Sequence, residues 1–137
     1  MTSNVPIALD AAPGIAYILY RGVMVRINKE LSKGTHEIIV LELLSRKDMH
    51  GYELIQEMEL VSGKAFSMSQ GSLYPLLHVM ESKNHIDSYE TTVNGRKRRY
   101  YRLTEEGRSV LAHKKQQWED LVNAMERILG RELSEQP

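Results

Sequence analysis

Five of the eighteen Lys and Arg residues of this chain fall within seven positions, from Arg96 to Arg102, in the stretch GRKRRYYRLTEEG. The chain as a whole carries no formal net charge. A neutral protein that concentrates cations on one short segment is suited to meet an acidic partner there, and the local patch matters more than the total charge. Guanidinium and ammonium groups are the usual ligands of phosphate. The chemistry predicted for this segment is therefore phosphate binding.

The surrounding sequence shares this charge. Residues 64–102 contain seven basic and three acidic side chains, whereas residues 24–63 and 103–137 each have a net charge of −2. The middle of the chain is thus cationic and its flanks are mildly acidic, so a neutral total does not argue against a nucleic-acid partner.

Other chemistry finds no support in the sequence. The chain has no Cys, which excludes disulfides, thiolate nucleophiles and Cys-based zinc sites. Its five His residues lack metal-ligand spacing, and no Gly-rich phosphate loop or nucleophile elbow is present. We expect a protein that is not an enzyme and that needs no cofactor or metal.

The start of the chain shows no membrane or secretion signal. Its longest apolar run, Ile15 to Tyr20, is far shorter than the roughly 20 residues of a membrane-spanning helix, and no Lys or Arg precedes it. We expect a cytoplasmic protein with no membrane partner.

Three helices are predicted ahead of the cationic segment. The first is a largely buried helix of about ten residues that follows Thr35 as its N-cap and contains the apolar stretch Ile38 to Leu44. The second lies in GYELIQEMELVSG and ends at Gly63. The third lies in SQGSLYPLLHVMESKN, where the apolar residues recur at i, i+3, i+4 and i+7 on one inward stripe: Leu73, Leu76, Leu77 and Met80.

The start of the third helix is open between two residues. With Ser72 as N-cap, Pro75 would stand at the third helical position, where its missing N–H loses no bond. With Ser69 as N-cap, Pro75 would lie inside the helix and a kink is required.

A hairpin and a long helix follow. HIDSYETTV and RRYYRLT are β-prone runs, and the Asn94-Gly95 pair between them is a strong signal for a tight hairpin turn. Thr104 then caps a helix whose first turn contains two acids. The predicted order is helix, helix, helix, hairpin, long helix.

This order is that of a winged helix-turn-helix, a mainly α (α+β) fold with a two-stranded wing. The wing cations Arg96, Lys97, Arg98 and Arg99 would contact DNA phosphates and supply sequence-independent affinity, with Lys64 as a further cation. Bases would be read from the exposed start of the third helix, for which the candidate residues are Ser69, Gln70, Ser72, Tyr74 and His78. Each feature by itself has another explanation. Lys and Arg on a hairpin can serve only to protect an edge strand from aggregation, and Ser at a helix start can serve only to cap the helix.

Three segments together resemble the PadR family of bacterial transcriptional regulators: HGYELIQEM, SQGSLYPLLHVME and GRKRRYYRLTEEGR. The resemblance covers roughly residues 28 to 129, and His50 stands where a Tyr is usual in the family. It implies a homodimeric repressor that binds an inverted repeat in double-stranded DNA. The single C-terminal helix is similar to that of the short subfamily.

The long C-terminal helix is predicted to make the dimer. Its apolar residues fall on positions a and d of a heptad: Leu111, Trp118, Leu121, Met125 and Ile128. Val110 and Leu111 are expected to pack on their own domain, while the rest outrun a small domain. Trp118 matches the position at which multidrug-sensing relatives carry a Trp lining an effector pocket, so a small planar aromatic effector is a further expectation.

The expected domains are an N-terminal extension at 1–27, the winged helix-turn-helix at 28–103, the dimerisation helix at 104–130 and a flexible tail at 131–137. For the extension there are two interpretations. It is an untranslated in-frame leader ahead of Met24, or a real segment whose Ile15 to Tyr20 stretch packs as a helix. The first fourteen residues are expected to hold little regular structure.

Two other functions remain open. A winged-helix domain can serve as a protein-interaction module without DNA binding, which would not need the cation cluster. A repressor of the MarR type would differ mainly in a longer helical N-terminal arm.

Overall fold

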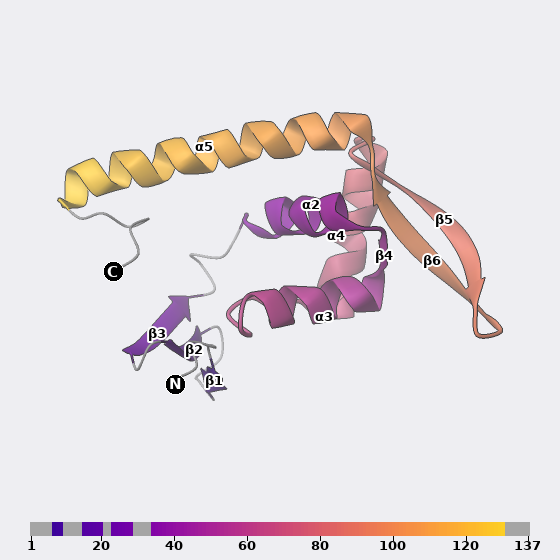
Figure 1. The fold of residues 1–137 in the computed structure, drawn as a ribbon, viewed down its shortest axis with the longest axis horizontal. Helices are drawn as coiled ribbons and strands as arrows, with labels where there is room; N and C mark the ends of the chain where they lie inside the picture. Colours follow the sequence, from indigo (N-terminus) through magenta and orange to yellow (C-terminus); the bar gives the residue numbers. More distant parts are fainter. Residues whose placement is uncertain (1–6, 10–14, 21–22, 29–33, 131–137) are drawn as a thin grey trace.

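The computed structural model describes residues 7–9, 15–20, 23–28 and 34–130 (Figure 1). The described elements, in chain order, are β1 (Ile7–Leu9), β2 (Ile15–Tyr20), β3 (Val23–Asn28), α2 (His36–Arg46), β4 (Met49–His50), α3 (Gly51–Val61), α4 (Gln70–Ser82), β5 (Ile86–Val93), β6 (Arg96–Leu103) and α5 (Glu105–Leu129). The expected tail at 131–137 lies outside the described residues.

The N-terminal strands form their own antiparallel sheet in the order β1-β2-β3. Ile7 pairs with Leu19, and Leu19 in turn pairs with Met24. The interpretation of Ile15 to Tyr20 as a helix is therefore wrong, and β1 gives the first fourteen residues a short strand. The reason is local, because β2 consists largely of the β-branched and aromatic residues that favour strands.

The three helices α2, α3 and α4 enclose the core. Their buried side chains meet those of the second sheet and of the first turns of α5; the cluster includes Leu41, Leu44, Leu54, Met58, Leu73, Leu77, Met80, Ile86, Tyr101 and Leu103. Two predictions are confirmed. Helix α3 ends just before Gly63, whose φ is 62°, and α4 buries Leu73, Leu77 and Met80 of its predicted stripe, with Leu76 partly buried beside them. Thr35 stands at the N-cap of α2, but its side chain makes no capping bond.

The N-cap of α4 is Ser69, whose side chain accepts a hydrogen bond from the Ser72 backbone N–H. Pro75 thus lies inside the helix, where its missing N–H removes one helical bond. Ser69 prevails because its hydroxyl reaches the third residue of the helix, as an N-cap requires.

The second sheet has three strands in the order β4-β6-β5. The predicted two-stranded wing is confirmed as β5 and β6. Met49 and His50 add the short strand β4 at its base, where they pair with Tyr101 and Tyr100. The predicted hairpin is confirmed: Val93 pairs with Arg96, and Asn94 and Gly95 have φ of 51° and 78°. Two consecutive positive φ values are those of the type I′ turn, which matches the twist of the strands.

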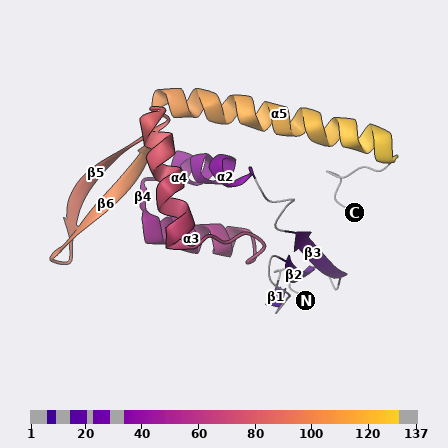
Figure 2. The same cartoon turned by 180° about the vertical axis from the view of Figure 1, so that it is seen from behind.

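Helix α5 begins directly after the wing and extends past the helical core, as both views show (Figures 1 and 2). Thr104 caps it, accepting from the Gly107 N–H at 2.9 Å and donating to the Asn84 carbonyl at 2.7 Å. Leu111 is only 6% exposed and belongs to the core of its own chain, as expected for it and Val110, so it adds little to the heptad surface predicted for the dimer. Within the described residues, no helix is long and apolar enough to cross a membrane.

Candidate nucleic-acid interface

The wing presents its cations on two faces. Side chains alternate along a strand, and Tyr101 and Leu103 of β6 are buried in the core. Lys97 and Arg99 therefore share the inner face with them, while Arg96, Arg98 and Arg102 lie on the outer face with Tyr100.

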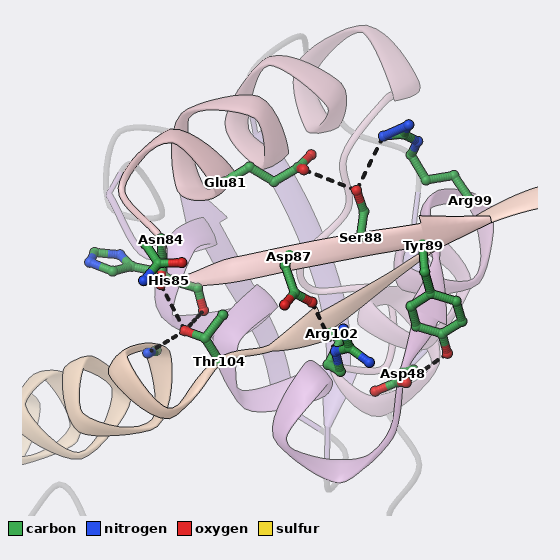
Figure 3. A network of polar contacts seen from close by, with 11 residues as sticks. Asp48, Glu81, Asn84, His85, Asp87, Ser88, Tyr89, Arg99, Arg102 and Thr104 are labelled. Atoms are coloured by element: carbon green, nitrogen blue, oxygen red, sulfur yellow. Dashed lines mark hydrogen bonds and ion pairs between the residues drawn. The ribbon is translucent and has the colours of Figure 1, made fainter.

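Arg102, at the base of the wing, is paired with a carboxylate of its own chain. Its Nε donates to Asp87 Oδ1 at 2.9 Å, and its guanidinium lies 5.2 Å from the centre of the Tyr89 ring. The hydrogen bond to Asp87 raises the pKa of Arg102 above its ordinary value. Tyr89 is held in turn, because its hydroxyl donates to Asp48 at 2.7 Å, and this bond raises the pKa of the phenol. Figure 3 shows this chain of contacts.

Arg99 is partly engaged on the inner face. Its Nη1 donates to the Ser88 hydroxyl at 3.1 Å, and Ser88 donates to Glu81 of α4 at 3.0 Å. Glu90, its cross-strand partner, lies 3.9 Å from Nη2. The bonds that join Arg99, Ser88 and Glu81, visible in Figure 3, tie the wing to the C-terminal end of α4.

Arg98 forms a hydrogen bond with His50, and this bond competes with a second bond that the same imidazole makes. Arg98 Nη1 lies 2.9 Å from His50 Nε2, while His50 Nδ1 accepts from the Glu53 N–H at 3.2 Å and so caps α3. Both ring nitrogens therefore face donors, but a neutral imidazole has one acceptor nitrogen only. The cap and the Arg98 bond compete, so Arg98 can leave for a better acceptor at small cost.

The two cations at the tip of the wing have no partner in the part of the chain that the structure describes. Among residues 34–130, neither Arg96 nor Lys97 makes an ion pair or a side-chain hydrogen bond, and both are exposed. Of the five clustered cations, these two are the most available to an external anion.

A cleft of about 360 Å³ opens between the wing and the helices. Its lining comes from the start of α3, from α4 and from β6: His50, Gly51, Tyr52, Tyr74, Arg96, Lys97, Arg98, Arg99 and Tyr101. The Tyr74 ring lies so close to Gly51 that a Cβ at that position would be 2.6 Å from the phenol oxygen. The structure thus brings one predicted base-reading residue, Tyr74, to the same cleft as the four predicted phosphate-binding cations.

The other residues predicted to read bases from α4 are exposed as well, but they differ in whether their side chains already have hydrogen-bond partners within the protein. Ser69 caps the helix and also donates to the Ser72 hydroxyl at 3.2 Å, so the capping interpretation holds for Ser69. Gln70 makes no side-chain hydrogen bond within the described part of the chain, and His78 is exposed one turn after Tyr74. Lys64 lies in the α3–α4 loop, at the end of α3 remote from β4, and does not line the cleft.

The predicted dimer residues other than Leu111 form an exposed stripe on α5. Trp118 and Leu121 are each 52% exposed and Ile128 is 78% exposed, with Met125 between them. Sequence reasoning missed an apolar hollow of about 280 Å³ lined mainly by α2 and α3, with Ile38, Ile39, Val61 and Phe66 among its residues. It also missed His50 as a cap, for which its place just before a helix was the available signal.

Comparison with known proteins assigns the family. The family model described as "Transcriptional regulator PadR-like family" matches residues 40–113. The chain belongs to this PadR-like family.

Known transcriptional regulators are similar to this PadR-like regulator in sequence and in fold. It is 32% identical over 94 residues to the transcriptional regulator Rv3488 of Mycobacterium tuberculosis, an alignment covering 69% of this chain and 85% of the relative. A PadR family regulator from Clostridium difficile R20291 is similar with a TM-score of 0.63 and 36% identity, over 70% of this chain and 99% of the other. A transcriptional regulator from Clostridium thermocellum has a TM-score of 0.66 and 26% identity, over 72% and 96% of the two chains. The winged-helix fold and a role in transcription regulation are thereby established.

Proposed function

We propose that this PadR-like regulator is a homodimeric repressor that acts in the cytoplasm and binds an inverted-repeat operator. The observation that supports it most is the shared cleft, where Tyr74 of α4 and the cations of the wing face one space. A winged helix-turn-helix places its recognition helix in the major groove, and the wing then lies along the backbone.

The contacts divide by chemistry. Arg96 and Lys97 are unpaired and would bind phosphates outright, while Arg98 would exchange His50 for a phosphate oxygen, a stronger charge-assisted acceptor. Gln70 can pair bidentately with adenine. Ser72 and Tyr74 lie on the same exposed start of α4, and His78 is exposed one turn after Tyr74. Lys64 would contribute at most a peripheral contact.

Helix α5 supports the proposed dimer. An apolar stripe that includes Trp118, Leu121, Met125 and Ile128 is exposed in the single chain, and burial against a second copy removes it from water. A two-fold dimer carries two recognition helices related by that symmetry, which suits an inverted repeat.

A small planar aromatic effector belongs to the same proposal. The half-exposed Trp118 ring offers a stacking surface on the dimer helix. Such a compound would release the operator only if it bound the DNA-free arrangement of the two subunits more tightly than the DNA-bound one.

The test is a retardation assay on the DNA immediately upstream of the protein's own gene, with a random duplex of equal length as reference. We expect tighter binding to the upstream duplex and a steep loss of affinity with salt. Absence of any salt-dependent DNA retention would favour the alternative, a winged-helix protein-interaction module.

A further inference from the structure

Gly71 has no structural reason within the protein to be a glycine. It is the second residue of α4 and is exposed, and its φ is not in the left-handed region. A Cβ built on it would meet only the Ser69 hydroxyl, at an ordinary contact distance of 3.8 Å. Alanine would therefore fit here, and it would favour the helix, because glycine is the weakest helix former apart from proline.

The other glycines of the described core make the contrast clear. Residues 34–130 contain seven glycines, and four of them adopt positive φ: Gly34, Gly63, Gly95 and Gly130. Two more lack space for a side chain, since a Cβ would lie 2.6 Å from Tyr74 at Gly51 and 2.0 Å from the His85 carbonyl at Gly107. Gly71 is the one glycine in this range for which the fold gives no such reason.

The position of Gly71 points to the DNA. It stands between Gln70 and Ser72 and three residues before Tyr74, at the exposed start of the proposed recognition helix. Glycine is used where a backbone must come close to a ligand. We infer that Gly71 is where the backbone of α4 makes van der Waals contact with the base edges of the operator, leaving no room for a Cβ.

Base edges are favoured over phosphates by the charges of α4. Residues 65–82, which contain the whole helix, include no Lys or Arg. Phosphate binding is instead concentrated on the wing, with Arg96 and Lys97 unpaired at its tip. A methyl group at position 71 should therefore disturb the specific complex and leave nonspecific binding nearly unchanged. This inference rests on the proposed function.

The test is a graded series at one position, Gly71→Ala and Gly71→Ser, measured on the best-bound upstream duplex and on a random duplex of equal length. The matched control is Ser82→Thr, which adds one methyl at the opposite end of the same helix, where the hydroxyl can keep its bond to the Val79 carbonyl. Circular dichroism melting of every variant checks the fold.

We expect Gly71→Ala to melt at or above the wild-type temperature and yet to lose at least tenfold in affinity for the upstream duplex. Gly71→Ser should lose more, and random-duplex affinity should change less than twofold. Ser82→Thr should bind as the wild type does. Undiminished affinity in Gly71→Ala, or an equal loss on both duplexes, would overturn the inference alone. A wild-type protein that did not discriminate between the duplexes would overturn the proposed function and this inference together.

Discussion

The Tyr74 ring of α4 lies against the backbone of Gly51 at the start of α3, where a Cβ would be 2.6 Å from the phenol oxygen and 2.9 Å from the ring carbon that bears it. The contact joins the first turns of the two helices that form the helix-turn-helix. It also holds Tyr74 at the cleft that the wing cations line. In the proposed complex, the angle at which α4 would meet DNA therefore depends on the absence of a side chain at Gly51.

Replacing Gly51 by Ala should displace Tyr74 and weaken the fold. Overpacking of this kind typically costs about 1–3 kcal/mol, so urea unfolding should show a reduced free energy of unfolding. Because the clash is with Tyr74, the double variant Gly51→Ala/Tyr74→Ala should be destabilised by less than the sum of the single changes. Strict additivity would show that the two residues are not coupled.

The wing cations should differ in their effect on salt dependence according to their pairing. Arg96→Ala and Lys97→Ala each remove an unpaired cation and should flatten the slope of log affinity against log salt by about one unit. Affinity for operator and random duplexes should fall by a similar factor.

Arg102→Ala is the control for these variants, because Arg102 is already bonded to Asp87. Its slope should match that of the wild type. If it flattened the slope as strongly as Arg96→Ala, pairing within the protein would not decide which cations meet phosphate. Loss of discrimination in Arg96→Ala or Lys97→Ala would mean that the wing reads bases.

Two leucines on α5 should separate folding from association. Leu111 is buried in its own chain, so Leu111→Ala should destabilise the protein by about 2–5 kcal/mol at every concentration. Leu121 is 52% exposed, so Leu121→Ala should instead weaken the dimer and make the melting temperature more dependent on concentration. Sedimentation equilibrium measures the dissociation constant, and a monomeric wild-type protein would refute the proposed dimer.

Glu42 should give the stability a specific dependence on acid. Burial acts to raise the pKa of its carboxyl, but bonds with Lys115 of α5, Arg46 and Ser45 outweigh this and hold the pKa below its ordinary value. A lowered pKa means that the ionised form stabilises the folded state above the ordinary value. That contribution is lost as the pH falls through the folded-state pKa.

Glu42→Gln should therefore lower the free energy of unfolding at neutral pH by up to about 1 kcal/mol, a modest effect because Lys115 is exposed to solvent. The difference from wild type should vanish in acid, as measured by urea unfolding from pH 7 down to pH values below the ordinary Glu pKa of 4.5. Glu119→Gln on the exposed surface of α5 is the control for the loss of one negative charge, and it should leave the free energy of unfolding at neutral pH nearly unchanged. A difference for Glu42→Gln that persisted in acid would exclude the ion pair as its cause.

The sequence predicts those parts of the fold whose signals are local. The Asn94-Gly95 turn, the Thr104 cap and the apolar stripe of α4 each depend on residues within a few positions of one another. The start of α4 could not be settled in this way, because Ser69 and Ser72 are both good caps and the structure uses both hydroxyls.

Contacts between residues far apart in the sequence could not be predicted from local signals. Met49 and His50 are too short a run to predict a strand, and become one because β6 offers them a free edge about 50 residues later. The contacts of His50 with Arg98 and of Tyr74 with Gly51 likewise join residues that are far apart in the sequence. The pairing of Arg102 with its cross-strand partner Asp87 could not be predicted from charge alone either.

Only Thr104 separates the last residue of β6 from the first residue of α5. Its backbone N–H donates to the His85 carbonyl at 3.2 Å, and the same carbonyl leaves no space for a Cβ at Gly107. The wing and the proposed dimer helix are therefore joined rigidly and should rotate as one unit. Strand β6 has eight residues, about 26 Å at roughly 3.3 Å each, so a rotation of this unit by about 10° about Thr104 moves the wing tip by about 5 Å. In the proposed dimer, a small change in how the two α5 helices cross would thus displace each wing by more than one base-pair step of about 3.4 Å.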